Sequence, residues 1–192
     1  MGLLDWIYPK RCVGCGRTGR YVCGVCANTV QCKGHSLRYE GMVRKAIKEI
    51  KYRGSYDMIQ ELVYLWEQKV DMKVGNGVVT AVPMWAQKEK KRGFNQAVLV
   101  AREIAKRWEL RYVELLVRTR DTKPMYGLDR TSRQKNVSNA FALIHKNQAL
   151  SLKHERVILV DDVWTTGETM RECAKVLSKN GMNRVVFVTI AR

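Results

Sequence analysis

Two acidic residues and a group of hydroxyl side chains stand close together near the end of the chain. Asp161 and Asp162 are adjacent, and Thr165, Thr166 and Thr169 follow shortly after them. The hydroxyls and the backbone N–H groups of such a loop can hold a phosphate. The carboxylates can accept hydrogen bonds from sugar hydroxyls or from water bound to magnesium. The pattern therefore predicts a site for a phosphorylated sugar.

The flanking residues supply the elements that would position this loop. Residues 157–160 are an unbroken apolar run, which is typical of a strand buried on both faces in a parallel sheet. Residues 167–179 have helical character, so a helix N-terminus, whose dipole favours an anion, would face the loop. The alternative is a solvated acidic turn in which Thr165 or Thr166 only caps the helix. Capping needs one hydroxyl and no preceding acid pair, which favours the phosphate site.

A second candidate site lies near the N-terminus. It consists of two Cys-x-x-Cys pairs, Cys12 with Cys15 and Cys23 with Cys26. Four thiolates in two turns suit tetrahedral zinc and leave no coordination position open, which predicts a structural metal site. Disulfides and a redox pair are the alternatives, but a cytosolic setting disfavours disulfides and a redox motif needs only one pair. The segment is too short to build a core unaided, so metal binding would supply its folding energy.

The remaining potential metal ligands are placed less favourably. Cys32 and His35 follow the second cysteine pair and could replace one of its ligands, but we expect both to be bystanders. Cys173 falls inside the helical segment after the threonine loop and is predicted to be a small core residue.

A strand–loop–helix unit also precedes the acidic pair. Residues 78–82 are predicted to form a strand ended by Pro83, and residues 85–92 a polar and very basic loop. Gly93 then opens a long helix with an apolar stripe. Right-handed crossovers between two such units build a parallel sheet. Arg92 could contact a phosphate from this loop through charge-assisted hydrogen bonds.

Other segments carry positive charge without an obvious partner. Residues 37–70 are predicted to form two helices interrupted at Gly54. The candidate contacts to DNA or another polyanion are Lys51, Arg53, Lys88, Lys90, Lys91, Arg118 and Arg133. The alternative for these cations is a solvated surface with little energetic consequence.

The second half of the chain contains further strands and one long polar segment. Residues 111–117, 141–144 and 185–190 are predicted strands. Residues 118–139 are polar and basic, without strong periodicity. A stretch of this length inside a compact domain is often a functional flap.

Composition narrows the class of partner. The chain has 192 residues with 35 Lys and Arg against 18 Asp and Glu, giving a net charge of +17. Such a charge favours nucleic acid or phosphorylated ligands as partners. The longest apolar runs are far too short to span a bilayer. The N-terminus lacks the cationic region of a secretory signal, so we expect a cytoplasmic protein.

The order of these motifs is similar to that of a known family. Residues 157–169 resemble the phosphoribosyl pyrophosphate (PRPP) signature of type I phosphoribosyltransferases. The cysteine pairs, the Arg-Gly-Phe-Asn-Gln run at residues 92–96 and this signature follow one another as in the ComF family, which includes late-competence and GntX-like proteins. The resemblance covers nearly the whole chain.

The resemblance implies a fold and a cellular setting. It implies an α/β protein whose type I phosphoribosyltransferase domain, residues 37–192, is a mostly parallel sheet flanked by helices, behind a four-cysteine zinc finger at residues 1–36. It also implies a role in natural transformation, in the handling of incoming single-stranded DNA. A helicase-like partner protein and association with the cytoplasmic side of the uptake machinery belong to the same expectation.

Two functions follow from the resemblance, and they share one site. The implied PRPP-binding residues, with Mg²⁺, are Asp161, Asp162, Thr165, Thr166, Gly167, Glu168, Thr169 and Arg92, while Zn²⁺ is structural. One function is a competence protein that binds PRPP there and single-stranded DNA through its basic surface. The alternative is an active phosphoribosyltransferase with an unidentified acceptor, in which residues 118–139 close over PRPP. No residue is assigned as catalytic.

Overall fold

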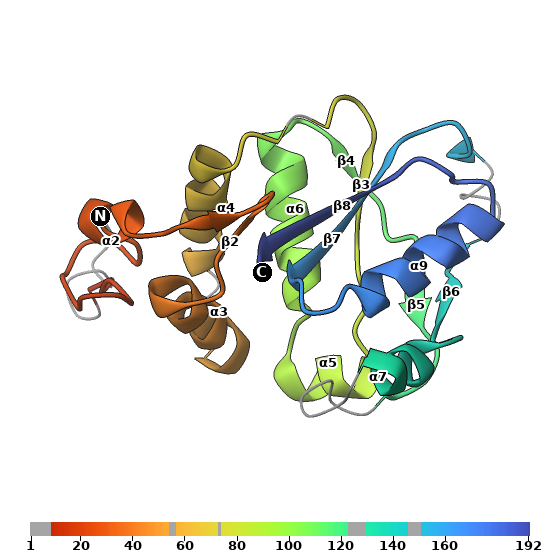
Figure 1. The fold of residues 1–192 in the computed structure, drawn as a ribbon, viewed down its shortest axis with the longest axis horizontal. Helices are drawn as coiled ribbons and strands as arrows, with labels where there is room; N and C mark the ends of the chain where they lie inside the picture. Colours follow the sequence, from red (N-terminus) through yellow and green to blue (C-terminus); the bar gives the residue numbers. More distant parts are fainter. Residues whose placement is uncertain (1–8, 54–56, 73, 123–129, 146–150) are drawn as a thin grey trace. The chain divides into compact units, whose positions relative to one another are not determined.

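A computed structural model describes residues 9–53, 57–72, 74–122, 130–145 and 151–192 (Figure 1). The chain forms two compact units, Met1–Met72 with Ile190–Arg192, and Lys73–Thr189. The first unit extends beyond residue 36 because two helices belong to the same unit as the cysteine segment. The assignment of residues 1–36 as a zinc finger stays a prediction.

The first unit consists of short elements and a helical hairpin. Its elements are α2 (Gly24–Asn28), β1 (Cys32–Lys33), β2 (Ser36–Leu37), α3 (Gly41–Arg53) and α4 (Asp57–Lys69). Strands β1 and β2 pair antiparallel, and Leu37 of β2 pairs in parallel with Ala191 at the end of the chain. The two predicted helices are confirmed. Ile47 of α3 and Leu62 and Trp66 of α4 are buried, as their helical spacing predicts.

The second unit is built on a parallel sheet in the order β8-β7-β3-β4. The strands are β3 (Val78–Ala81), β4 (Arg111–Tyr112), β7 (Val157–Val163) and β8 (Val185–Ala191). Strand β3 pairs in parallel with both β4 and β7, and its register with β7 runs from Val78↔Val157 to Ala81↔Val160. The predicted α/β class with a mostly parallel sheet is confirmed.

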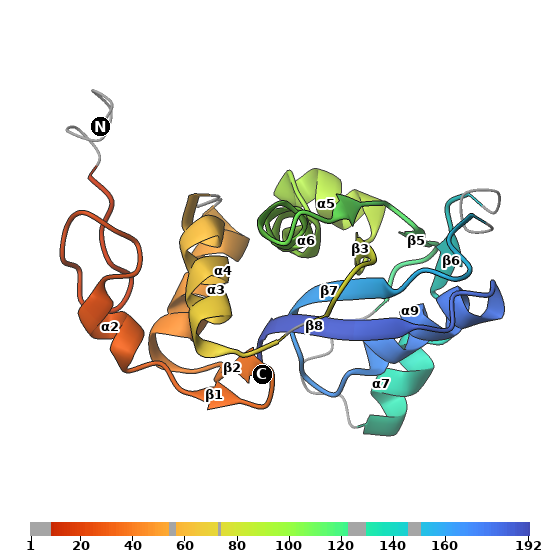
Figure 2. The same ribbon diagram turned by 90° about the horizontal axis from the view of Figure 1, so that it is seen from above.

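Helices cover both faces of this sheet (Figure 2). Helix α6 (Gln96–Arg107) packs on β3 and β7 from one side, and α9 (Glu168–Lys179) packs against β7 from the other. This two-sided cover explains why residues 157–160 are uniformly apolar and fully buried. Helix α7 (Arg130–Val137) lies against α9.

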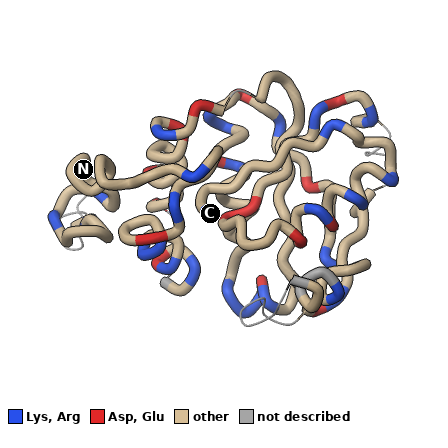
Figure 3. The backbone as a smooth tube through the Cα atoms, viewed as in Figure 1, with Lys and Arg blue, Asp and Glu red and all other residues tan. Residues whose placement is uncertain are grey.

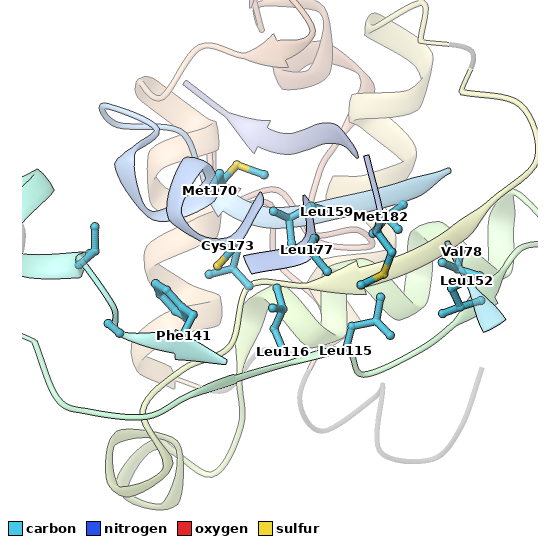
Figure 4. Packing of buried hydrophobic residues seen from close by; sticks show 14 residues of the cluster. Val78, Leu115, Leu116, Phe141, Leu152, Leu159, Met170, Cys173, Leu177 and Met182 are labelled. Carbon is cyan, nitrogen blue, oxygen red and sulfur yellow. The ribbon is translucent and has the colours of Figure 1, made fainter. Parts of the chain in front are cut away.

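The core of the second unit lies between α9 and the strands (Figure 4). Leu159 of β7 and Met170, Cys173 and Leu177 of α9 are buried together there. The prediction that Cys173 is a core residue is confirmed, since its side chain is fully buried. The separate antiparallel pair β5 (Leu116–Arg118) and β6 (Phe141–Leu143) adds Phe141 to this core.

The predicted basic loop at residues 85–92 is wrong, because Ala86–Arg92 form helix α5. The run Ala-Gln-Lys-Glu-Lys-Lys-Arg consists of strong helix formers, and its charge obscured that propensity. Gly93 ends the helix in the left-handed region, with φ 88°, and its N–H donates to the Glu89 carbonyl at 2.7 Å.

The single strand predicted at residues 111–117 is also wrong. It divides into β4 and β5, which belong to different sheets. Between them the Leu115 N–H donates to the Thr80 hydroxyl at 3.3 Å. Leu115 and Leu116 are both buried, so the chain turns between the sheets instead of alternating.

Part of the predicted flap at residues 118–139 is helical. Helix α7 was hidden because it has no apolar periodicity, and only Val137 among its described side chains is buried. Arg120 Nη2 donates to the carbonyls of Asn136 and Ser138 at 3.1 and 2.7 Å, which holds the C-terminal end of α7. Residues 123–129 lie outside the described residues.

Cations are spread over both units (Figure 3). Lys and Arg side chains occur on α3 and α5 as well as in connections, with acids between them. In the described part of the chain, no helix is long and apolar enough to cross a membrane.

Candidate functional site

The acid pair lies inside β7. The sequence had predicted that it follows the end of the strand. Strand β7 continues to Val163, so Asp161 and Asp162 are its fifth and sixth residues. Their side chains are half-buried, and the Asp162 N–H donates to Asp161 Oδ1 at 2.8 Å. The strand therefore delivers both carboxylates to the edge of the sheet from which the loop departs.

The loop after β7 ends at Gly167, the residue that precedes α9. Gly167 has φ 79°, and a Cβ atom built there would overlap the indole ring of Trp164. Only glycine fits both the left-handed backbone and the ring beneath it. Gly167 offers no side-chain cap to α9, whereas Asn95 caps α6 through its Oδ1 atom. The first backbone N–H groups of α9 thus have no side-chain partner at the N-cap position, where a phosphate can accept from them.

An arginine of α9 braces the same loop. Arg171 Nη1 donates to the Thr166 carbonyl at 2.8 Å and to Glu168 Oε1 at 2.7 Å. The guanidinium also lies 5.8 Å from the centre of the Trp164 ring, and that ring packs against Phe187 with a centroid distance of 5.8 Å. These contacts hold the loop after β7 against α9.

The expected ligand residues differ in their surroundings. Thr165 is exposed, Thr166 and Thr169 are half-buried, and Gly167 is buried. Glu168 is buried and paired with Arg171. Its carboxylate holds the brace, and a contact from Glu168 to a ligand stays a prediction.

The sequence analysis missed Arg171 and Trp164. The Glu168–Arg171 pair has the i, i+3 spacing of neighbouring helix side chains, which would have indicated it. Trp164 carries no such signal, because its contact with Gly167 depends on how the loop folds.

Arg92 lies at the end of α5, near the start of α6. It is half-buried, and its Nη1 atom donates to Gln96 Oε1 at 2.7 Å. Gln96 Nε2 is buried and has no hydrogen-bond partner in the described residues. Asn95 Nδ2 donates to the Val82 carbonyl at 3.0 Å, which ties this corner to the end of β3. Because β3 and β7 are parallel neighbours, Arg92, which follows β3, and the acid pair, in the last part of β7, lie toward the same edge of the sheet.

Arg118, at the end of β5, is half-buried and does not lie on an exposed surface. Its guanidinium lies 5.5 Å from the centre of the Phe141 ring, and its Nε atom is buried without a hydrogen-bond partner in the described residues. Burial lowers the pKa of Arg118, while the charges of Asp121 and Asp161 oppose that shift.

A cleft of about 390 Å³ lies between α5, α6 and strands β4 and β5. Its walls include Phe94, Leu99, Val117 and Ile144, with Arg118 as a charged member. None of residues 161–169 lines this cleft. It is therefore separate from the loop after β7.

The remaining candidate cations have varied settings. Lys88, Lys90 and Lys91 are exposed on α5, whereas Lys51 of α3 is half-buried. The side chains of Arg53 and Arg133 lie outside the described residues.

The four predicted cysteines form one cluster in the first unit. The sulfur atoms of Cys12, Cys15, Cys23 and Cys26 all lie within 4.8 Å of one another, and those of Cys15 and Cys23 are 3.6 Å apart. The cluster can hold a metal ion. Glycine is required beside it, because a Cβ atom on Gly14 would lie 2.6 Å from Cys26 Sγ.

Local hydrogen bonds shift the pKa values of Cys12 and Cys26 in opposite directions. Burial raises the pKa of Cys12, but the backbone N–H groups of Cys23, Cys15 and Gly14 outweigh it and lower the pKa to about 6. Hydrogen bonds between the thiol protons and sulfur atoms of Cys26, Cys12 and Cys23 raise the pKa of Cys26 to about 12. A bound cation would displace these protons.

The surroundings of the cluster belong to the first unit as well. The Val22 N–H donates to Glu61 Oε2 at 2.8 Å, which ties the second cysteine turn to α4. Cys32 Sγ donates to the Lys69 carbonyl at 3.4 Å, and the His35 carbonyl accepts from Trp66 Nε1 at 3.1 Å. Both Cys32 and His35 lie outside the group of four.

Comparison with known proteins agrees with this geometry. The profile of the phosphoribosyl transferase domain family matches residues 90–192, which include α6, the acid pair and α9. The chain therefore belongs to the phosphoribosyl transferase domain family.

Two curated relatives are similar to this chain over more than half of its length. The chain is 35% identical to DNA utilization protein YhgH of Escherichia coli over 118 residues, which is 59% of this chain and 48% of the relative. It is 34% identical to Competence protein F of Haemophilus influenzae over 116 residues, 59% of this chain and 49% of that protein. The chain spans about half the length of the curated relatives it matches. These relatives confirm the resemblance to the ComF family.

Two solved structures are similar to this chain at a low level. Adenine phosphoribosyltransferase from Thermoanaerobacter pseudethanolicus is 17% identical, with a TM-score of 0.45 and coverage of 79% of this chain and 76% of that one. Glutamine PRPP amidotransferase from B. subtilis is 17% identical, with a TM-score of 0.44 and coverage of 70% and 25%. The fold assignment rests on the family match and the strand order.

Changing Gly167 to Ala should destabilise the protein by about 1–3 kcal/mol, because the new Cβ atom forces a strained backbone and displaces Trp164. Urea unfolding followed by tryptophan fluorescence measures this loss. Gly24→Ala is the control, since a Cβ atom there meets no heavy atom within 4 Å. Equal stability of both variants would contradict the role given to Gly167.

Proposed function

We propose that this chain binds PRPP with Mg²⁺ at the loop between β7 and α9, and that it acts in competence-related handling of single-stranded DNA. The open N-terminus of α9 carries the first part of this proposal. Gly167 leaves the first N–H groups of α9 without a side-chain cap, and the Arg171 and Trp164 contacts hold the loop in that shape. A rigid loop at a helix N-terminus that has no side-chain cap fits a phosphate.

Each candidate residue has a role that its chemistry allows. The loop amides with the hydroxyls of Thr165, Thr166 and Thr169 would hold the 5-phosphate. Asp161 and Asp162 would accept from ribose hydroxyls and from water on Mg²⁺, which would neutralise charge on the pyrophosphate.

Arg92 would contact the pyrophosphate. Its Nη1 atom already donates to Gln96, so Gln96 would orient the guanidinium. Arg118 would moderate the charge of the acid pair from the end of β5, because the Asp161 charge acts on its guanidinium.

PRPP with Mg²⁺ should raise the melting temperature of the wild-type chain. A ligand at 100 times its Kd stabilises a protein by about 2.7 kcal/mol, so the shift is readily measured by differential scanning fluorimetry. Asp161→Asn with Asp162→Asn should abolish the shift, because the hydroxyl and magnesium contacts need carboxylates. Asp71→Asn, at an exposed acid of the first unit, is the control. An identical shift in the double variant would refute the site.

Transfer of the phosphoribosyl group to an acceptor is the second candidate function. Membership in the phosphoribosyl transferase domain family supports it. Release of pyrophosphate from PRPP on addition of an acceptor would distinguish turnover from binding alone.

The DNA role draws on charge and on the relatives. The chain carries a net charge of +17, and the names of the two relatives refer to DNA utilization and competence. A helicase-like protein remains the proposed partner, and the cytoplasmic side of the uptake machinery the proposed location.

Zinc is the proposed ion for the cysteine cluster. Zn–S bonds of about 2.3 Å in a tetrahedron place the sulfur atoms about 3.8 Å apart. The 3.6 Å separation of Cys15 and Cys23 is close to that value. Four thiolates with no position left open suit a structural ion, and its binding would stabilise the segment around α2.

Protein purified without chelators should contain about one zinc per chain, as measured by elemental analysis. Gly14→Ala should lower that content severalfold, because the added methyl group displaces Cys26 Sγ. Gly24→Ala, where the backbone is not left-handed and a Cβ atom meets nothing within 4 Å, should retain the ion. Absence of zinc from the wild-type protein would contradict the assignment.

A further inference from the structure

We propose that the outward face of α3, formed by Arg44, Lys45, Lys48 and Tyr52, is the surface that binds single-stranded DNA. The inference rests on the proposed function, since it assigns a place to the DNA binding proposed above. It assigns DNA binding to one row of side chains on α3, in place of the dispersed cations that the sequence analysis proposed as candidates.

Burial divides α3 into two faces. The buried side chains are all apolar: Met42, Val43, Ala46, Ile47 and Ile50. Arg44, Lys45, Lys48 and Tyr52 are exposed. Arg44, Lys48 and Tyr52 recur at intervals of four residues, so they form one row along the exposed face, with Lys45 beside it.

The positive charges of this row lie at spacings that destabilise an isolated helix. Arg44 and Lys48 are at i, i+4, and Lys45 and Lys48 are at i, i+3, spacings at which like charges repel. Among the described residues, no ion pair engages Arg44, Lys45 or Lys48. Glu49 is the only acid in the helix. Phosphates along this face would relieve the repulsion.

Tyr52 adds a feature that charge alone does not provide. Its side chain is 76% exposed, the highest value among the exposed large hydrophobic side chains of the described residues. An exposed ring at the end of a cationic row can stack with a base, as in proteins that bind single strands without sequence preference. Four helical residues advance about 6 Å, comparable with the phosphate spacing of an extended strand.

Helix α5 is the other cationic helix, and it lacks this combination. Lys88, Lys90 and Lys91 are exposed there. The neighbouring Trp85 is half-buried, and its Nε1 atom donates to Gln87 at 3.2 Å. Because α5 carries charge without an exposed aromatic ring, we favour α3 over α5 as the surface that binds single-stranded DNA.

The test is fluorescence anisotropy of a labelled oligothymidylate with the full chain, over a range of salt concentrations. Changing Arg44, Lys45 and Lys48 together to Gln should weaken binding at least about tenfold and reduce the log–log salt slope by about 2, for three lost phosphate contacts. Tyr52→Ala should weaken binding about fivefold or more, and Tyr52→Phe should retain affinity, because stacking needs the ring.

The matched control changes Lys88, Lys90 and Lys91 of α5 to Gln, which removes the same charge. Its affinity and salt slope should stay close to those of the wild type. Both triple variants should keep the melting shift with PRPP and Mg²⁺, which shows that they are folded. An unchanged slope in the α3 variant, or a greater loss in the α5 variant, would overturn the inference while leaving DNA binding intact.

Two further outcomes separate this inference from the function on which it rests. A wild-type chain that binds no oligothymidylate would overturn the DNA role itself, and the α3 inference with it. Binding of the α3 face to phosphatidylserine vesicles in place of the oligonucleotide would identify a membrane surface and also overturn the inference.

Discussion

The parallel pairing of β3 with β7 is the constraint on which the second unit depends. Four consecutive residue pairs align from Val78↔Val157 to Ala81↔Val160, and every one of these side chains is buried. In parallel neighbours the chain leaves both strands at the same edge of the sheet. Arg92 after β3 and Asp161 in β7 therefore come to the same edge of the sheet, although they are far apart in the sequence. Loss of this register would separate them.

The shape of the loop after β7 depends on two local arrangements, one at Gly167 and one at Arg171. Gly167 occupies a left-handed conformation over the Trp164 ring, and Arg171 closes the loop from α9. Together these arrangements leave the N-cap position of α9 without a side-chain cap. A helix capped by its own side chain, as α6 is by Asn95, would have no such opening.

The cysteine segment of the first unit is stabilised in a different way. Its strands contain two residues each, and α2 has no buried residue among those described. The segment has little apolar surface with which to offset its loss of conformational entropy. Convergence of four cysteines and the bond from Val22 to Glu61 hold it near α4, and an ion would complete that connection.

The sequence determined the features that depend on local chemistry. The four cysteines, the buried strand before Asp161, the glycine and threonines after it, and the helices α3, α4, α6 and α9 are readable because spacing and apolar periodicity encode them. It did not determine α5, whose charge masked its helix propensity, or α7, which has no apolar periodicity.

Only the tertiary structure decided which side chains meet. It placed Arg118 in the field of Asp161, used Glu168 to hold Arg171, and put Trp164 beneath Gly167. It also turned one face of α3 outward, which distinguishes exposed Lys48 from half-buried Lys51. These relations depend on packing between segments distant in the chain, or on which face of a helix is covered, and local sequence carries neither.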